Sequence, residues 1–384
     1  MSIYEESEEF HRKLRGKLSI APKIPINDKK TLSLAYTPGV AHVSQLIAGD
    51  KKKVYDYTSK WNSVAIVSDG SRVLGLGNVG PEAAMPVMEG KAMIFKQFGN
   101  VDAYPLCIDV HTSEEIAAVV KAIAPTFGGI NLEDISSPKC FEVEGKVADI
   151  GIPIFHDDQH GTAIVTLAAL INALKVVGKK KDVKIAVLGA GAAGYGIITL
   201  LNAYGIKDIV VTDSKGIIYD GRTGNDYYKS RIAGMTNIRK IKGDVADAVK
   251  GTDVVIAVSG IKNLLTKEII KTMNKRSILF VLTNPEPEIS YEDALEAGAE
   301  VVGTGRSDLP NQINNSLAFP GVFRGTLDAR AKKITPEMKI AAAEAIASLV
   351  EHPSAQHIVP STTENIVHTK VAEAVKKAYK DYYY

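Results

Sequence analysis

The chain has 384 residues, of which 45% are hydrophobic and 23% charged, a balance that predicts two or three globular domains and excludes a disordered or fibrous protein. Its 46 Lys and Arg residues nearly balance its 44 Asp and Glu residues, so we expect no nucleic-acid partner. The N-terminus is acidic without an apolar core, the uncharged stretch 185–203 is interrupted by glycines, and two cysteines are too few for a disulfide scaffold. We therefore expect a cytoplasmic protein with neither a signal peptide nor a membrane span.

Predicted helices and strands alternate along the first part of the chain. Apolar residues at helical spacing predict helices at 3–14, 82–98, 113–124, 138–149 and 161–177. Apolar runs predict strands at 63–68, 104–110, 129–132 and just before Asp157. Because strands that alternate with helices form parallel sheets, we predict a parallel sheet here.

Two side chains in this part have notable neighbours. Tyr36 comes just before Pro38 and Gly39, which can start a helix and allow close approach of the backbone. Taken alone, Tyr36 is explained as well by packing as an ordinary aromatic residue. Lys91 lies among apolar residues of the predicted helix at 82–98, which would place its amine near an apolar face, although a helical lysine is usually on the surface.

Two acidic pairs follow predicted strands. Glu133 and Asp134 come after the strand at 129–132, and Asp157 and Asp158 come after the apolar run at 152–156. Ligands bind at the carboxyl ends of strands in α/β sheets. Negative charge gathered there is unfavourable unless protons or a cation offset it, and Mg²⁺ or Mn²⁺ suits carboxylate ligands. Two solvated acidic loops are the alternative, and the commoner arrangement for such doublets.

A strand predicted at 184–188 leads into a glycine-rich turn and a helix to about residue 204. Such a turn lets a pyrophosphate approach the backbone at a helix N-terminus. The turn residues that we predict to bind a dinucleotide are Gly189, Gly191, Ala192, Ala193 and Gly194. Asp213 ends the next strand, where it would bind ribose hydroxyls and repel a 2′-phosphate, whereas Lys215 would accept one if Asp213 turned aside. Strands at 253–259, 277–283 and 300–303 complete a doubly wound sheet.

We predict an α/β fold with an N-terminal α/β substrate and metal domain at 1–158 and a doubly wound, Rossmann-type dinucleotide-binding domain at 159–310. A C-terminal segment at 311–384 would complete the cleft and return two helices to the first domain. The first of these helices starts near Thr335, and Ser361 with Glu364 would form the capping box of the second.

These motifs resemble those of the malic enzymes, in order from about residue 15 to 330. The residues that carry the resemblance are Tyr36-Thr37-Pro38, Asp69-Gly70-Ser71-Arg72, Lys91, Glu133-Asp134, Asp157-Asp158, the glycine turn, Thr283-Asn284-Pro285 and Phe319-Pro320-Gly321. The chain is similar to the short prokaryotic branch, without the acetyltransferase-like C-terminal extension of some longer relatives. The resemblance implies oxidative decarboxylation of (S)-malate to pyruvate and CO₂ with reduction of NAD or NADP, and oxaloacetate decarboxylation as a further activity.

The resemblance also implies a role for each site residue. Glu133, Asp134 and Asp158 would bind Mg²⁺ or Mn²⁺, with Asp157 beside them as a supporting residue. Lys91 would be the general base, its pKa lowered by burial and the nearby cation, and Tyr36 the general acid. The residues that would bind malate are Arg72, Lys91, Asn284 and Asn315, with Asn314 as the alternative to Asn315 and with Asn284 also contacting the cofactor. A homodimer or homotetramer is expected, with part of the active site supplied by a neighbouring subunit.

Two other functions remain open on the sequence alone. A metal-independent amino-acid or hydroxy-acid dehydrogenase would share the nucleotide-binding unit but would not need the carboxylates. A catalytically inactive dinucleotide sensor would keep only that unit, and the presence of Tyr36 and Lys91 argues against it.

Overall fold

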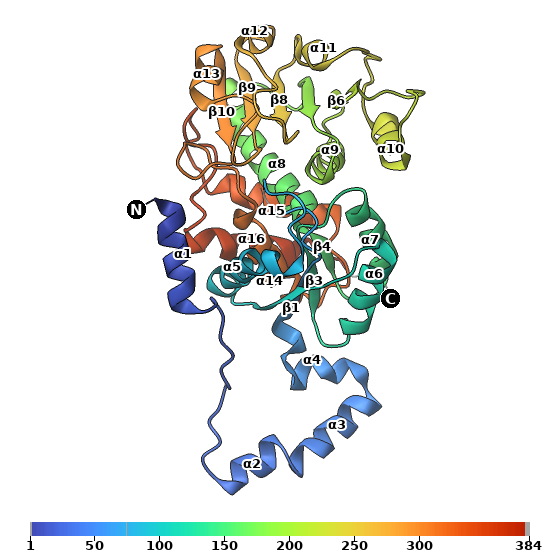
Figure 1. The fold of residues 1–384 in the computed structure, drawn as a ribbon, viewed down its shortest axis with the longest axis vertical. Coiled ribbons are helices and arrows are strands. Elements are labelled where there is room, and N and C mark those ends of the chain that lie inside the picture. The colour runs from blue at the N-terminus through green and yellow to red at the C-terminus, as the bar shows by residue number, and fades with distance from the viewer. Residues whose placement is uncertain (1, 74, 381–384) are drawn as a thin grey trace.

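The computed structural model describes residues 2–73 and 75–380; Leu74 of the Asp69–Pro81 loop lies outside the described residues. The chain forms two parallel-stranded sheets with helices around them, and an extended N-terminal part (Figure 1). The α/β fold with two sheets, the second of Rossmann type, is confirmed.

The first sheet has four parallel strands in the order β2-β1-β3-β4. Its strands are β1 (Ser63–Ser68), β2 (Asp102–Cys107), β3 (Gly129–Leu132) and β4 (Ile154–His156), and the helices between them are α5 (Pro81–Gly99), α6 (Ser113–Ile123) and α7 (Lys139–Val147). Every residue of β1 and β3 is buried, as expected for strands covered on both faces. β2 ends earlier than predicted, because Cys107 pairs with Ser68, the last residue of β1.

Helix α8 (Asp157–Val177) connects the two sheets and begins earlier than the predicted residue 161. Its first turn therefore includes Asp157 and Asp158, and negative side chains are favourable at a helix N-terminus. By length and composition α8 resembles a membrane span, but 72% of its most apolar window is buried inside the protein. It packs against α9 (Ala192–Tyr204) and α15 (Pro336–Ser348) as a core helix.

The second sheet has the order β10-β9-β8-β5-β6-β7, in which only the β6–β7 pair is antiparallel. Its strands are β5 (Ile185–Leu188), β6 (Ile209–Asp213), β7 (Gly216–Ile217), β8 (Val254–Ala257), β9 (Ser277–Val281) and β10 (Ala299–Thr304). The helices after α9 are α10 (Tyr227–Met235), α11 (Val245–Val249), α12 (Lys267–Ile270) and α13 (Tyr291–Glu296). Successive residues of β5, such as Val187 and Leu188, belong to different hydrophobic clusters, one on each face of the sheet. Helices therefore cover both faces, as in a doubly wound sheet.

The C-terminal segment returns to the helices of the first sheet. It contains η3 (Asn315–Leu317), α14 (Phe319–Asp328), α15 and α16 (Asn365–Ala378). Phe95 of α5 contacts Phe319 and Phe323 of α14, with ring centroids 4.7 and 5.2 Å apart. The predicted capping box does not start the last helix: Ser361 N–H donates to Glu364, but α16 begins only after Glu364, because this bond closes the preceding turn.

The N-terminal part contains α1 (Ile3–Leu14), α2 (Lys29–Ala35), α3 (Gly39–Gly49), η1 (Lys51–Lys53), α4 (Val54–Tyr57) and η2 (Ser59–Asn62). We refer to residues 29–49, which form α2 and α3, as the N-terminal arm. The arm extends away from both sheets (Figure 1). Among the described residues, α1, α2 and α3 contribute no buried side chain, so apolar residues of the arm such as Leu34 are open to solvent.

Candidate active site

The two acidic pairs meet at one edge of the first sheet. β3 and β4 are neighbours, with Leu132 opposite His156, so the residues that follow these strands lie at the same level. Glu133, Asp134 and Asp158 each present one ligand atom, and these atoms lie within 4.8 Å of one another. Glu133 and Asp134 are each only 5% exposed. The alternative of two solvated acidic loops is therefore wrong.

Burial and mutual repulsion change the protonation of these carboxylates. Burial raises the pKa of Glu133 well above its ordinary value against the opposing charge of Lys91, and the neighbouring carboxylates raise it further. Burial and the charge of Asp158 raise the pKa of Asp134 to about 7. Burial also acts on Asp158, but its contact with His156 prevails and lowers its pKa. Asp134 therefore takes up a proton near neutral pH when no cation is bound.

The cluster suits a divalent cation with oxygen ligands. Oδ2 of Asp134 is buried and has no hydrogen-bond partner within the described residues, and such an oxygen is costly unless a cation or a proton meets it. Asp134 has a φ of 52°, a left-handed conformation that a short polar residue tolerates. In this conformation its N–H donates to Oδ2 of Asp158 over 3.1 Å. Glu133, Asp134 and Asp158 therefore fit Mg²⁺ or Mn²⁺.

Lys91 lies inside the same cluster. Its Nζ is 2.5 Å from Oε1 of Glu133 and 2.5 Å from Oδ2 of Asp157, and 4.6 Å from the centroid of the Phe319 ring. Burial lowers the pKa of Lys91, but Asp157 and Glu133 outweigh burial and hold it above its ordinary value. Burial alone therefore does not lower the pKa of Lys91 below its ordinary value. The expected lowering would require a cation that neutralises the carboxylates around the amine.

Asp157 forms an ion pair with Lys91 and is not one of the three converging carboxylates. Its side chain is fully buried and contacts Lys91, and it is not among the three residues whose oxygens converge. A Cβ added to Gly161, one turn later in α8, would come 1.9 Å from Oδ1 of Asp157. Glycine at this position leaves space for the carboxylate.

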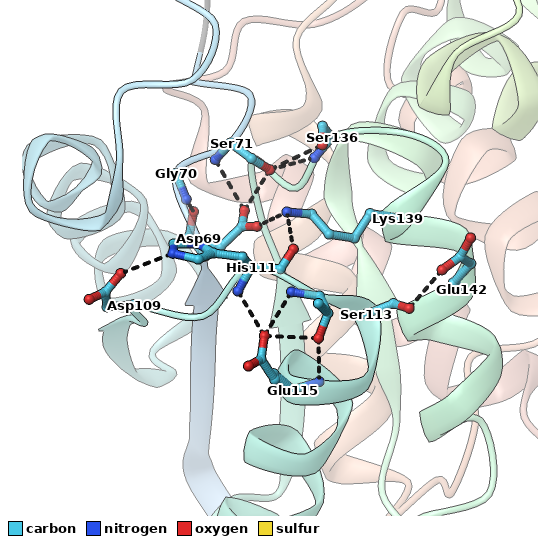
Figure 2. A network of polar contacts seen from close by, with 12 residues as sticks. Asp69, Gly70, Ser71, Asp109, His111, Ser113, Glu115, Ser136, Lys139 and Glu142 are labelled. Carbon is cyan, nitrogen blue, oxygen red and sulfur yellow. Dashed lines mark hydrogen bonds and ion pairs between the residues drawn. The ribbon is translucent and has the colours of Figure 1, made fainter.

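A polar network fixes the loop after β1 against the start of α7 (Figure 2). The Asp69 carboxylate accepts hydrogen bonds from the N–H and the hydroxyl of Ser71, at 3.1 and 2.7 Å, and also pairs with Lys139. The hydroxyl oxygen of Ser71 accepts a hydrogen bond from the N–H of Ser136 over 2.9 Å. These contacts connect the loop that carries Arg72 to the loop that follows β3.

The expected substrate residues come from separate segments. Arg72 N–H donates to the Asp134 carbonyl over 2.9 Å, and its guanidinium makes no ion pair within residues 2–73 and 75–380. A Cβ on Gly260, in the loop after β8, would lie 3.4 Å from Nη2 of Arg72. Asn284 follows β9 and donates to the Gly305 carbonyl over 3.1 Å. The Arg72 side chain thus extends toward the carboxyl edge of the second sheet.

Asn314 and Asn315 have different surroundings. Oδ1 of Asn314 caps η3 by accepting a hydrogen bond from the N–H of Ser316 over 2.9 Å. Asn315 lies against α8 near Gly161, where its Cβ is 3.1 Å from the position of a Cβ on that glycine. Because Asn314 is engaged in capping, the geometry favours Asn315 as the substrate residue.

Tyr36 lies apart from this cluster. It is the C-terminal cap of α2 and is 66% exposed. Because the N-terminal arm extends away from the sheets (Figure 1), a single chain does not bring Tyr36 to Lys91.

The glycine turn after β5 has the geometry of an anion site. A Cβ on Gly189 would come 2.6 Å from a backbone oxygen of the loop after β8, and one on Gly194 would come 1.9 Å from the Gly189 carbonyl. Close packing thus requires glycine at both positions. At Gly191, in contrast, a Cβ would meet only one side-chain oxygen, at 3.8 Å. α9 begins here with Ala192 and Ala193, and no side chain caps it, so its first N–H groups remain available for a pyrophosphate.

Two family models together match most of the chain. Residues 15–148 match the malic enzyme N-terminal domain, and residues 159–379 match the malic enzyme NAD binding domain. The chain belongs to the malic enzyme family. It is accordingly an NAD(P)-dependent enzyme of a family that uses a divalent metal ion.

Curated and solved malic enzymes are similar over nearly the whole chain. A bifunctional malic/malolactic enzyme of Bacillus subtilis (strain 168) is 53% identical over 98% of this chain and 93% of its own length. An NAD-dependent malic enzyme of Geobacillus stearothermophilus is 50% identical over 96% of this chain and 78% of its own length. The crystal structure of an NAD-dependent malic enzyme from Thermotoga maritima has a TM-score of 0.93 and 49% identity, with 96% and 98% of the chains covered.

Two buried residues of this malic enzyme were not anticipated. Nδ2 of Asn131 donates to Oε2 of Glu133 over 2.8 Å, and Nε2 of His156 lies 3.3 Å from Oδ2 of Asp158. Both are 0% exposed; Asn131 orients the Glu133 carboxylate through its hydrogen bond, and His156 lies beside the Asp158 carboxylate. Asn131 interrupts an apolar strand, and this interruption is the signal in the sequence that would have found it.

Asp157→Asn should weaken Mn²⁺ binding less than Asp158→Asn. Asp158 supplies a candidate ligand oxygen, whereas Asp157 contacts Lys91. We expect a loss of roughly 10- to 100-fold for Asp157→Asn, the cost of removing an outer partner, and of more than about a hundredfold for Asp158→Asn, which removes a ligand. Free Mn²⁺ measured by electron paramagnetic resonance reports both affinities. Equal losses would contradict the division between the two aspartates.

Mn²⁺ affinity should also fall as the pH is lowered through about 7, because the pKa of Asp134 is raised to about 7 and the ion requires its ionised form. Below that pH we expect about a tenfold loss per unit for each proton displaced. Titrations at several pH values around 7 measure this slope. In the Asp134→Asn variant the affinity should be lower and the slope shallower; a pH-independent affinity in the original chain would rule out competition by protons.

Proposed function

We propose that the chain catalyses oxidative decarboxylation of (S)-malate to pyruvate and CO₂, with reduction of NAD(P)⁺ in the presence of Mg²⁺ or Mn²⁺. The observation that carries this proposal is the contact of Lys91 with Glu133 and Asp157, which places a potential base within a cluster of carboxylates suited to a divalent ion. A metal-independent dehydrogenase would have no use for the three converging carboxylates.

Arg72, Asn284 and Asn315 are the residues that we propose to bind the dicarboxylate. The guanidinium of Arg72 extends toward the second sheet and can bind a carboxylate through two parallel hydrogen bonds. Asn315 lies beside the start of α8, which carries Asp157 and Asp158. Malate held between these groups would have its C2 hydroxyl near Lys91 and one face toward the nicotinamide.

The reaction divides among a few groups. Lys91 accepts the proton of the C2 hydroxyl while hydride leaves C2 for the nicotinamide, which gives oxaloacetate. A bound Mg²⁺ or Mn²⁺ would supply Lewis-acid stabilisation of the C2 oxygen during oxidation and loss of CO₂. Tyr36 then helps to protonate C3, which yields pyruvate. Asp157 orients the Lys91 amine through its contact with Nζ. The second half of this sequence accounts for the proposed decarboxylation of added oxaloacetate.

Tyr36 can take part only if it reaches Lys91 from another subunit. The N-terminal arm projects from its own chain and exposes Leu34 and Tyr36, and apolar surface of this kind is ordinarily covered in an oligomer. We therefore propose a homodimer or a larger symmetric homo-oligomer in which the arm of one subunit places Tyr36 in the active site of its partner. We also propose that the enzyme works in the cytoplasm.

An assay at 340 nm with malate, Mn²⁺ and each dinucleotide should give reduced cofactor and an equal amount of pyruvate. EDTA should abolish the reaction, because the ion takes part in both steps. Lys91→Ala should lower kcat by roughly 10²- to 10⁴-fold, the usual contribution of a general base. Lys96→Ala removes an exposed lysine from the same helix and should leave kcat unchanged. Full activity in EDTA would favour the metal-independent dehydrogenase, and inactivity with both dinucleotides the sensor.

Mixing two inactive variants tests the exchange of Tyr36. If the active site is shared, a hybrid of Lys91→Ala and Tyr36→Phe chains has one site with both side chains and one with neither. Random mixing at equal amounts should then restore about a quarter of the original activity for a symmetric dimer. Tyr57→Phe, which changes another exposed tyrosine, is the control and should be active alone. No recovery in mixtures that demonstrably contain hybrids would place Tyr36 and Lys91 in the same chain's site.

A further inference from the structure

Asp213, at the end of β6, is saturated with hydrogen bonds. Arg222 binds it through two parallel contacts, Nη1 to Oδ1 at 2.9 Å and Nη2 to Oδ2 at 2.6 Å. Nζ of Lys229 lies 2.9 Å from Oδ2, and the N–H of Lys215 donates to Oδ1 over 2.8 Å. A carboxylate has about four acceptor positions, and these four contacts occupy them. Asp213 therefore has no acceptor left for the two hydroxyls of an adenosine ribose.

We refer to Arg222 and Lys229 together with Asp213 as the Asp213 clamp. Within it, Arg222 is buried against Asp213, whereas Lys229 is more exposed to solvent. The side chains of Asp213 and Arg222 are 7% and 8% exposed, whereas that of Lys229 is 27% exposed. Nε of Arg222 is also bound, by Oδ1 of Asn225 at 2.8 Å. Paired, charge-assisted bonds of this kind are among the strongest in proteins. A ligand can therefore attract Lys229 more readily than it can release Asp213 from Arg222.

The clamp lies where the adenosine ribose of a dinucleotide would be. Gly189 N–H donates to the carbonyl of Thr212 over 3.0 Å, so the glycine turn and Asp213 are at the same level of adjacent strands. α10 lies beside α9, with the rings of Tyr228 and Tyr195 6.2 Å apart. Lys229 extends from α10 to Asp213, so its ammonium lies at the end of β6, on the strand next to the one that leads into the glycine turn.

The net charge of the clamp is positive. Arg222 and Lys229 carry two positive charges against the single negative charge of Asp213. Lys215, in the turn between β6 and β7, is exposed and adds a third positive charge nearby. The expectation that Asp213 repels a 2′-phosphate considered only the carboxylate charge and left out the charges of Arg222 and Lys229 beside it. A phosphate dianion would be attracted to it.

We propose that Arg222 and Lys229 make this site prefer NADP⁺ to NAD⁺, with Lys229 binding the 2′-phosphate and Arg222 keeping Asp213 away from the ribose. This inference rests on the proposed use of NAD(P)⁺ at the glycine turn but not on malate as the substrate. It assigns to Asp213 a supporting role, the positioning of two cations, in place of direct recognition of the ribose hydroxyls.

Binding of four probes to the full chain tests this preference without a turnover assay. NADPH and NADH are titrated by fluorescence, and 2′,5′-ADP and 5′-AMP by calorimetry. In the original chain NADPH and 2′,5′-ADP should bind at least about tenfold more tightly than NADH and 5′-AMP, the size of a charge-assisted contact. Lys229→Gln should weaken the binding of NADPH by about tenfold and the binding of NADH by less than about twofold. Lys207→Gln makes the same charge change at the opposite end of β6 and should alter neither affinity.

Asp213→Asn separates the two roles of the aspartate. If Asp213 acts only through Arg222 and Lys229, this change should leave NADH binding within about twofold, because no hydrogen bond to the ribose hydroxyls is lost. A loss of tenfold or more in NADH affinity would overturn the proposal, as would equal or tighter binding of NADH in the original chain. Tight binding of 2′,5′-ADP by a chain inactive toward malate would disprove the proposed substrate and leave the cofactor preference intact.

Discussion

The structure depends on the burial of several carboxylates around one lysine. Glu133, Asp134 and Asp157 are almost inaccessible to solvent, and Lys91 is the only cation in ion-pair contact with any of these three among the described residues. Each charge removed from water costs several kcal/mol unless it is paired, and one lysine cannot pair with all of them. The raised pKa values of Glu133 and Asp134 express this imbalance. A divalent ion would remove it and would at the same time weaken the hold of the carboxylates on the Lys91 proton.

The fold supplies the rigid surroundings that such a cluster needs. Adjacent parallel strands β3 and β4 end at the same level, and α8 begins directly after β4, so its N-terminus faces the negative charge. α5 carries Lys91, and Phe319 of the returning C-terminal segment packs over the amine. The second sheet presents its glycine turn at the start of α9, which packs against α8. The residues of the two sheets and the C-terminal helices thus build one site, to which the N-terminal arm adds nothing within its own chain.

Much of this arrangement could be predicted from the sequence, because it rests on local patterns. Apolar runs predicted the bounds of β1 and β3 correctly, and the spacing of the glycines predicted the turn between β5 and α9 that we propose to bind the dinucleotide. Other features depend on packing. The position of Tyr36 depends on the surface that covers the N-terminal arm, and the raised pKa of Lys91 depends on distances of 2.5 Å to two carboxylates. The partners of Asp213 are brought to it by the β6–β7 turn and by α10, which no spacing rule predicts.

We propose that Glu133, Asp134 and Asp158 hold one divalent ion beside Lys91. Anomalous diffraction at the manganese absorption edge, from crystals of the full chain grown with Mn²⁺, would locate this ion. We expect one strong peak per chain, within about 2.3 Å of an oxygen from each of these three residues and not bonded to Asp157. Crystals with Mn²⁺ bound only elsewhere, or a peak coordinated by Asp157 in place of Asp158, would show that these three residues do not form the metal site.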